Sequence, residues 1–539
     1  MPRSLLPLLL LLSPATCARV PGSPYAAPAA GLNASKSLLV LATAGLSADD
    51  AFAAAALQGA LARAAGGAPR MLRWDGSASA SLWLNITSTS WNVSLDWRCA
   101  SVACALAALA PGALSGYVTV SRADNSTNLG VLVAASKQGA AAALVPLPAS
   151  LVPAARAAGL TDAGDLRGAS FAKTLAAYGG PAAFAPRVAV LQRPDANACM
   201  SDFAIATGAL QFWDDNIFAP DLLPIWAQLA SQGAPFAMLG WGPDEYDTVT
   251  AVSVAGGAMV ASDWAQNLDV YSAFDAPAFS QPPPPPPPAP PAAAHTAAFL
   301  MSDGDNLQWL LNGFATDAAW WGSPDRGHVN MGWTLSPSVV DLAPVVAAHL
   351  YGSATAADHL VAGVSGVGYF YPDATTPESL AALADLTAAY MAKAGMRLVN
   401  VLGHGEGYAA EQVAPYVAQP QVDAVFWYNY DNYAGLRGNI TWQMGKPVIG
   451  ARFALWGDGS SPSGPTFCNN SQLVDRLLAL PRDPASPDAY SLIALHAWSH
   501  NVSDARAVAS ALAARAPGAV QIVTPAELVA RVARTLRPA

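Results

Sequence analysis

The chain has 539 residues, more than one hydrophobic core usually holds, so we expect two or three domains. Its net charge of −10 argues against a nucleic-acid partner, because binding phosphates requires clustered Lys and Arg. Hydrophobic residues make up 53% of the chain, but much of that share is alanine. Past residue 12 there is no unbroken apolar run of about 18 residues of the kind that spans a bilayer. We therefore expect a soluble globular protein.

The first eighteen residues have the pattern of a secretory signal peptide. Arg3 precedes the apolar run Leu5–Leu12, and small residues then permit cleavage after Ala18. A signal anchor, the alternative, would need a longer apolar run. The pattern predicts a secreted protein, extracellular or in the cell wall, with no membrane association after cleavage. Seven N-x-S/T sequons predict glycosylated surface loops, at Asn33, Asn85, Asn92, Asn125, Asn439, Asn469 and Asn501.

Four cysteines remain once Cys17 leaves with the signal peptide. An even number in an oxidising compartment is compatible with two disulfides. Cys99 and Cys104 are close enough in sequence to form a local bridge, which would leave Cys199 and Cys468 to pair across the chain. The sequence alone permits three connectivities.

Strand-like and helix-like stretches alternate from residue 36 to residue 280. Ser37–Ala42 has the pattern of a strand, and Ser47–Ala64 that of a helix capped by Ser47. Further strands are expected at Gly116–Ser121, Ala141–Leu147, Arg187–Leu191 and Pro235–Leu239. This alternation predicts βαβ units and a mostly parallel sheet, and hence a smaller α/β N-terminal domain at 36–280.

A proline-rich tract marks the domain boundary. Residues 281–293 contain nine prolines, which favour an extended polyproline helix and cannot join a packed core. We interpret this tract as a stiff linker.

The region 294–539 predicts a (β/α) barrel-like domain. Its expected strands are Ala297–Met301, His328–Trp333, Val361–Val364, Met396–Leu402, Ala424–Tyr428, Val448–Ala451, Ser491–Ala497 and Ala519–Val523. Seven or eight strands with helices between most of them, over roughly 240 residues, is the size of a (β/α) barrel. A doubly wound open sheet is the alternative fold.

Polar and aromatic residues follow several of these strands. Ala297–Met301 ends abruptly in the turn Ser302-Asp-Gly-Asp-Asn306, which could merely cap a helix at Leu307–Phe314. Other strand ends carry His404, Glu406, Asn429, Asp431, Arg452, Trp456, His496 and Trp498. Each of these alone is more often a turn or core residue. Together, carboxylates, amides and aromatic rings at the mouth of one barrel are typical of a carbohydrate site.

One heptapeptide carries a family resemblance. Gly366-Val-Gly-Tyr369-Phe-Tyr371-Pro372 matches the motif of the GxGYxYP family of glycoside hydrolases, and Ser302–Asn306 with Gln308-Trp309 is similar to that family's C-terminal domain. The N-terminal half resembles the companion domain at Leu57-Gln58-Gly59 with Arg63, Gly240-Trp241, Asp244-Glu245-Tyr246, and Ser262-Asp263-Trp264 with Asn267-Leu268. It departs at Ala60-Leu-Ala-Arg63, where the family tends to have Leu-Val-Asn-Arg. The resemblance implies a secreted or surface sugar-processing enzyme.

The candidate catalytic residues are Asp303, Asp305, Glu406 and Asp431. Asp303 and Asp305, neighbours in one turn, cannot flank a glycosidic bond, so Glu406 is the preferred partner and Asp431 the next. Candidate substrate-binding residues are Asn306, Trp309, Tyr369, Tyr371, His404, Trp427, Asn429, Arg452, Trp456, His496 and Trp498. The expected partner is an oligo- or polysaccharide, and neither a metal nor another cofactor is required. The sequence does not give the oligomeric state.

Two alternative functions remain open. Leu492–Trp498 and the segment from Val520 to Leu528 are similar to the last strands of polysaccharide deacetylases, which bind a divalent metal through Asp and two His. The paired His of those enzymes has no counterpart in this sequence. The other alternative is a carbohydrate-binding protein without catalysis. Two carboxyl groups facing each other at roughly 5–9.5 Å would favour a glycosidase over a binding protein.

Overall fold

The computed structural model describes residues 20, 23–25, 37–276, 279–283, 286, 293–405, 407–431, 433, 435–458 and 464–536. The expected signal peptide, Asn33, Glu406 and most of the proline-rich tract lie outside these residues. Gln281, at the start of that tract, is described. The Gln281 side chain accepts a hydrogen bond from the amide of Leu360 at 2.6 Å and donates one to the carbonyl oxygen of Leu360 at 2.9 Å. Among the described residues, no helix is both long enough and apolar enough to cross a bilayer.

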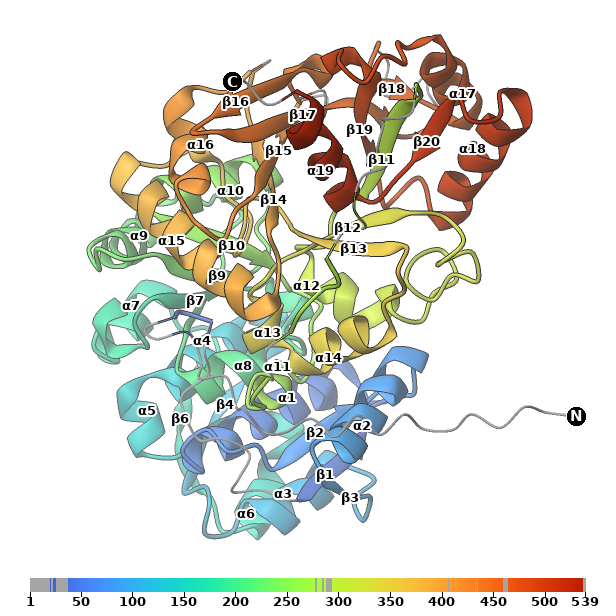
Figure 1. The fold of residues 1–539 in the computed structure, drawn as a ribbon. Helices are drawn as coiled ribbons and strands as arrows, with labels where there is room; N and C mark the ends of the chain where they lie inside the picture. The colour runs from blue at the N-terminus through green and yellow to red at the C-terminus, as the bar shows by residue number, and fades with distance from the viewer. Residues whose placement is uncertain are drawn as a thin grey trace, which may run out of the picture.

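The N-terminal half contains three small parallel sheets (Figure 1). Their strands are β1 (Ser37–Ala42), β2 (Met71–Trp74) and β3 (Ser94–Asp96) in the first; β4 (Gly116–Val120), β5 (Leu144–Pro148) and β6 (Thr161–Asp165) in the second; and β7 (Val188–Leu191), β8 (Leu210–Phe212), β9 (Phe236–Gly240) and β10 (Gly257–Ala261) in the third. The expected α/β alternation is therefore present, but its strands are divided among three sheets.

Helices lie between these strands and after the last of them. They are α1 (Ala48–Ala64), α2 (Ala78–Ser90), α3 (Val102–Leu109), α4 (Ser126–Ala135), α5 (Lys137–Ala141), α6 (Val152–Ala157), α7 (Phe171–Ala177), α8 (Ser201–Thr207), α9 (Leu223–Ala230), α10 (Glu245–Val254) and α11 (Leu268–Tyr271). The first begins where the sequence indicates, because Ser47 Oγ accepts a hydrogen bond from the amide of Asp50 at 3.0 Å.

The C-terminal half is a closed barrel of seven parallel strands, which confirms the (β/α) barrel over the open sheet. The strands are, in order around the barrel, β11 (His295–Met301), β12 (Met331–Leu335), β13 (Asp358–Ala362), β14 (Leu398–Gly403), β15 (Ala424–Asn429), β17 (Lys446–Leu455) and β19 (Tyr490–Leu495). Closure occurs at β11, whose C-terminal end pairs with β12 while its other edge pairs with β19.

Three further strands pair with the barrel without entering its ring. The expected eighth strand, β20 (Val520–Ile522), pairs only with His295–Ala297 at the start of β11. β16 (Ile440–Gln443) and β18 (Phe467–Cys468) pair with β17. The barrel helices are α12 (Leu307–Trp309), α13 (Val339–Leu342), α14 (Pro344–Ser353), α15 (Pro377–Ala394), α16 (Ala410–Val417), α17 (Asn470–Ala479), α18 (Val502–Arg515) and α19 (Pro525–Thr535). A π-helical turn at Leu310–Phe314 continues α12.

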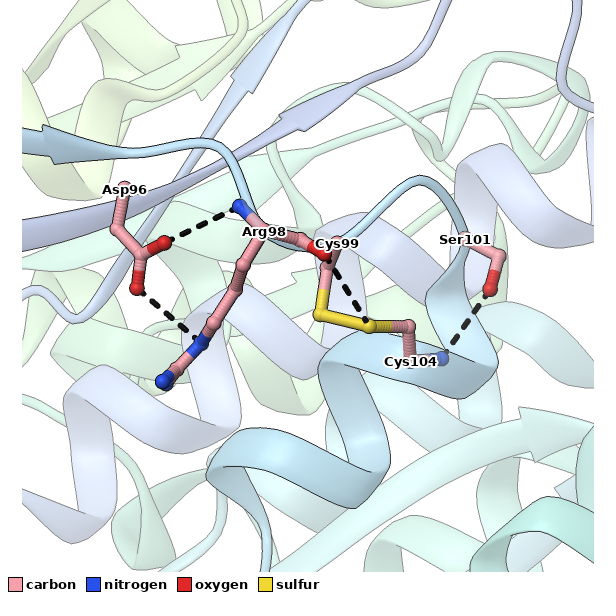
Figure 2. Close-up of a disulfide and its surroundings, with 5 residues drawn as sticks. All are labelled: Asp96, Arg98, Cys99, Ser101 and Cys104. Atoms are coloured by element: carbon pink, nitrogen blue, oxygen red, sulfur yellow. Dashed lines mark hydrogen bonds and ion pairs between the residues drawn. A yellow bond between two sulfur atoms is a disulfide. The ribbon is translucent and has the colours of Figure 1, made fainter.

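The two expected disulfides have different outcomes. Cys99 and Cys104 are bonded, with an S–S distance of 2.08 Å, and Figure 2 shows this bridge beside the Asp96–Arg98 ion pair and Ser101, which caps α3. Cys199 and Cys468 are both free and buried, so the expected long-range bridge between them is wrong. The reason is tertiary: Cys199 lies just before α8 in the N-terminal half, whereas the Cys468 thiol contacts the carbonyl of Ala454 within the barrel.

The sequon asparagines differ in accessibility. Asn85, Asn92, Asn125 and Asn439 are exposed. Asn469 and Asn501 are half-buried, and their side chains cap the first turns of α17 and α18. Glycosylation stays a prediction at all of these positions.

Candidate active site

A cavity of about 360 Å³ lies where the C-terminal ends of the barrel strands meet the third N-terminal sheet. From the barrel side it is lined by Ser302, Asp303, Asp305, Asn306, Gln308, Val364, Tyr369, Asn400, Leu402, Tyr428, Tyr433 and Trp498. The N-terminal half contributes Trp241, Glu245, Ala261, Asp263 and Trp264. The carboxyl ends of parallel strands are the usual place for a site in a (β/α) barrel. Here the N-terminal half supplies part of the lining.

The turn after β11 is held by its neighbour β12. The amide of Gly304 donates to Thr334 Oγ1 at 2.9 Å, and a Cβ at residue 304 would lie only 1.5 Å from the Thr334 carbonyl oxygen. A glycine is therefore required between the two aspartates. Asp303 itself has a left-handed backbone with φ of 67°, a conformation that costs a non-glycine residue about 1 kcal/mol or more and is frequent at functional sites.

Asp303 is half-buried and accepts two side-chain hydrogen bonds. One comes from Ser302 Oγ, and the other from Trp498 Nε1 at 3.0 Å. Burial raises the pKa of Asp303 to about 6, although both hydrogen bonds favour the ionised form. At neutral pH Asp303 therefore carries a negative charge for most of the time.

Asp305 is buried, with 8% of its surface exposed. Burial, and then repulsion from Asp303, raises the pKa of Asp305 to about 8. The two aspartates of one turn thus differ in protonation at neutral pH, Asp305 being protonated and Asp303 ionised. Carboxyl groups whose environments separate their pKa values in this way are typical of acid–base catalysis.

A third carboxyl group, that of Glu245, comes from the first turn of α10. Part of its side chain is exposed at the mouth of the cavity, and its Oε1 accepts a hydrogen bond from Tyr369 Oη at 2.9 Å. Desolvation raises the pKa of Glu245, and the hydrogen bond from Tyr369 opposes that rise. Sequence reasoning missed Glu245 as a candidate because it follows no barrel strand. The signal that could have identified Glu245 was the similarity of Asp244-Glu245-Tyr246 to the family.

The heptapeptide motif connects the two halves of the protein. Tyr369 and Met259 of β10 exchange two backbone hydrogen bonds, at 2.7 and 2.8 Å. The amide of Tyr371 donates to Ser253 Oγ of α10 at 2.9 Å. Gly366, at the start of the motif, has a φ of 129° and faces Thr387 so closely that a Cβ would lie 2.3 Å from its hydroxyl. The motif therefore fixes α10, and with it Glu245, at the mouth of the barrel.

Aromatic rings surround the mouth of the cavity. Trp264 is 51% exposed and Trp498 is 50% exposed, although both are large and apolar. Trp241 stacks on Tyr369 with ring centroids 6.5 Å apart. Exposed indole rings beside polar groups form surfaces on which the apolar face of a sugar can stack.

Polar side chains from other elements complete the cavity. Gln308 accepts a hydrogen bond from the amide of Trp264 at 2.7 Å and also hydrogen bonds Asp263. Asn400 of β14 is fully buried, and its Oδ1 has no hydrogen-bond partner. Asn400 escaped sequence reasoning because it lies within a strand, and Asp263 because it lies in the N-terminal half. In the described part of the chain, no three His, Cys, Asp or Glu side chains are grouped to hold a metal ion.

The structure brings five of the predicted site residues together in the cavity: Asp303, Asp305, Asn306, Tyr369 and Trp498. Two others lie directly behind its wall, and a third, His404, contacts one of these two. Trp309 is buried against Trp498 with centroids 4.9 Å apart, and Tyr371 is buried beside Tyr369 with hydroxyl oxygens 3.3 Å apart. The ring of His404 packs on Tyr371 at 4.4 Å, and its Nδ1 pairs with Asp373 at 2.7 Å.

The remaining candidates lie outside the lining. Trp427 and Asn429 are buried in β15, and the Asn429 side chain accepts a hydrogen bond from the amide of Asp431, which is exposed. Arg452 pairs with Asp488 at 3.3 Å. Trp456 and His496 stack on each other with centroids 3.7 Å apart. Their substrate roles stay predictions, and Glu406 is outside the described residues.

Comparison with known protein families gives two matches. Residues 293–533 match the "GxGYxYP putative glycoside hydrolase C-terminal domain", and residues 186–273 match the "GxGYxYP third domain". Among solved structures, a putative hydrolase from Bacteroides thetaiotaomicron superposes with a TM-score of 0.82 at 24% identity, over 94% of this chain and 96% of that one. This similarity establishes the fold. No functionally curated protein matches the chain.

Proposed function

Because the chain belongs to the GxGYxYP family, we propose that it hydrolyses a glycosidic bond in the cavity between the barrel and α10. The observation that carries the proposal is the convergence of three carboxyl groups with different surroundings. Asp305 is buried, Asp303 accepts two side-chain hydrogen bonds, and Glu245 accepts one from Tyr369. Most glycosidases use one protonated and one ionised carboxyl group.

Asp305 is the proposed general acid. Its pKa of about 8 keeps the proton on the carboxyl group at neutral pH, ready for transfer to the departing glycosidic oxygen. Burial chiefly maintains this state, repulsion from the ionised Asp303 adds to it, and the oxygens of Asp303 are available to a sugar hydroxyl.

Glu245 is the proposed second carboxylate, acting as nucleophile or as the base that activates water. It reaches the cavity from α10, whereas Asp305 comes from the turn after β11, so the two carboxyl groups are supplied by different elements. The hydrogen bond from Tyr369 favours the ionised form that either role requires. Trp264 and Trp498 would hold the sugar ring by stacking on its apolar face.

The test is release of reducing ends from a broad glycan panel by wild type, Asp305→Asn and Glu245→Gln, with and without chelator. We expect each variant to lose activity by about 100-fold or more, and chelator to have no effect. The matched controls are Asp317→Asn and Glu378→Gln, which alter exposed carboxylates away from the cavity and should remain active. Full activity of both Asp305→Asn and Glu245→Gln would refute the assignment. Chelator-sensitive acetate release would instead indicate a deacetylase.

We also propose that the protein acts outside the cell. The signal-peptide pattern supports this, as does the exposure of four sequon asparagines, Asn85, Asn92, Asn125 and Asn439. Removal of N-glycans from protein recovered from the culture medium of its source cells should lower its apparent mass. Retention of the protein inside those cells, without glycans, would contradict the proposal.

A further inference from the structure

Of the acidic and basic residue types, only Asp and Glu are found among the described residues that line the cavity. Glu245, Asp263, Asp303 and Asp305 contribute to its surface, and none of the described residues lining it is Lys, Arg or His. His404 and Arg452, the basic residues among the substrate-binding candidates, pair with Asp373 and Asp488 and do not line the cavity. A sugar carboxylate or sulfate would therefore enter a cavity that offers only like charges to it.

The hydrogen-bonding groups of the cavity are also unbalanced, with acceptors in excess of free donors among the buried atoms. Four of its donors are already committed to its own carboxylates. Ser302 Oγ and Trp498 Nε1 donate to Asp303, Tyr369 Oη donates to Glu245, and Gln308 hydrogen bonds Asp263.

The buried lining atoms without a hydrogen-bond partner are mainly acceptors. Asn400 Oδ1 and Asp263 Oδ1 are buried without a partner, and the only other lining side-chain atom in this state among the described residues is the Tyr428 hydroxyl, which can donate or accept. Asn400 is fully buried and Asp263 is 5% exposed, so bulk water does not readily satisfy either one. Each buried unpaired acceptor costs about 1–3 kcal/mol, so a side-chain movement that lets these oxygens accept from ligand N–H or O–H donors is favoured.

We propose that the cavity selects a sugar residue bearing a free ammonium group, in preference to the corresponding neutral, N-acetylated or anionic sugar. An ammonium carries a positive charge, three hydrogen-bond donors and no acceptor. It therefore complements both the negative charge of the lining and its excess of acceptors. A volume of about 360 Å³ suits a single sugar residue, so the amino sugar would occupy a chain end. This inference rests on the proposed glycoside hydrolysis for its catalytic consequence, but not for binding.

Binding is measured first, by calorimetry on Asp305→Asn, in which the amide imitates the protonated carboxyl and prevents turnover. The probes are glucosamine, glucose, N-acetylglucosamine and glucuronate, and the same set in the galacto configuration. We expect the free amino sugar to bind at least about tenfold more tightly than its neutral parent, with an advantage that shrinks as salt is added. Equal affinity for the neutral sugar, or tighter binding of the uronate, would overturn the inference.

A second substitution tests the lining itself. Asp263→Asn, made in the Asp305→Asn background, removes one carboxylate that the proposed chemistry does not use. It should reduce affinity for the amino sugar several-fold while leaving affinity for the neutral sugar nearly unchanged. Asp317→Asn in the same background is the control and should preserve the preference. An equal loss for both sugars in Asp263→Asn would show a structural role and count against the inference.

Hydrolysis of α- and β-linked aryl glycosides of the same sugars by the wild type separates this inference from the proposed function. Cleavage of the aminosides with the highest kcat/KM would support both. Cleavage without preference for the amino sugar would overturn the inference and leave the hydrolase standing. Selective binding of the amino sugar without cleavage of any glycoside would support the inference and count against the hydrolase.

Discussion

The phenolic oxygen of Tyr369 donates a hydrogen bond to Oε1 of Glu245 at 2.9 Å. This contact joins the heptapeptide motif of the barrel to the first turn of α10, and so links two segments more than 120 residues apart in sequence. It gives the motif tyrosine a chemical role, because the donated hydrogen bond favours the ionised form of Glu245.

Tyr369→Phe should reduce activity by about tenfold or more near neutral pH, and it should change the pH profile. Removing the hydrogen bond raises the pKa of Glu245, so the acidic limb of kcat/KM should move to higher pH. The profile of Tyr351→Phe, which loses a phenol hydrogen bond to Ala394 far from the cavity, should keep its shape. An unchanged acidic limb in Tyr369→Phe would separate Glu245 from the reaction.

Asp303→Asn should move the alkaline limb of the profile in the opposite direction. Repulsion from ionised Asp303 contributes to the raised pKa of Asp305, so removing that charge lowers this pKa. The general acid would then lose its proton at a lower pH, and kcat/KM should start to fall below the wild-type limb near pH 8. An alkaline limb that stays in place would show that another group supplies the proton.

Asp305→Asn should stabilise the protein at alkaline pH although it lowers activity. A pKa raised to about 8 in the folded state means that unfolding releases a proton, so the wild type loses stability as pH rises from about 4 to about 8. Asparagine does not ionise and avoids that loss. The thermal midpoint of the variant should exceed that of the wild type near pH 8, corresponding to about 1–3 kcal/mol, and the difference should vanish near pH 4. Greater stability of the wild type at both pH values would contradict the raised pKa.

Trp264→Ala should weaken substrate binding more than it slows turnover. The indole is 51% exposed at the mouth of the cavity, where it can stack on a sugar ring. Losing it should raise KM by about tenfold, with a smaller change in kcat. Trp97, which is 48% exposed and does not line the cavity, provides the control, and Trp97→Ala should leave both constants unchanged.

Gly366→Ala should destabilise the protein by about 2 kcal/mol or more. The residue has a φ of 129°, and a Cβ there would lie 2.3 Å from the Thr387 hydroxyl. Gly352, within α14, has no heavy atom within 4 Å of an added Cβ, so Gly352→Ala should be neutral or stabilising by up to about 1 kcal/mol. Thermal unfolding of both variants checks the difference. Equal midpoints would show that the motif loop tolerates a side chain.

The sequence determined most of the barrel and one wall of the site. Buried apolar strands give a continuous signal, and the Ser302–Asn306 turn interrupts that signal at the point where Asp303 and Asp305 enter the cavity. The disulfide between Cys99 and Cys104 could also be predicted from the sequence, because a separation of five residues keeps the two thiols close together. Where the strand pattern was less regular, the observed strand boundaries differ from the predicted ones. β12 begins at Met331 and not at His328, whose amide closes a turn with Asp325.

Only the tertiary structure decided which residues share the cavity with those two aspartates. Glu245 and Asp263 lie on segments whose local pattern is that of a helix start and a turn, and they reach the barrel because the motif loop pairs with β10. The separation of Cys199 from Cys468, the ion pair that occupies Arg452 and the complete burial of Trp427 have the same origin. Residue type and local periodicity indicate which side chains are chemically able to bind or catalyse. Long-range packing determines which of these side chains share a cavity, and hence which protonation states they hold.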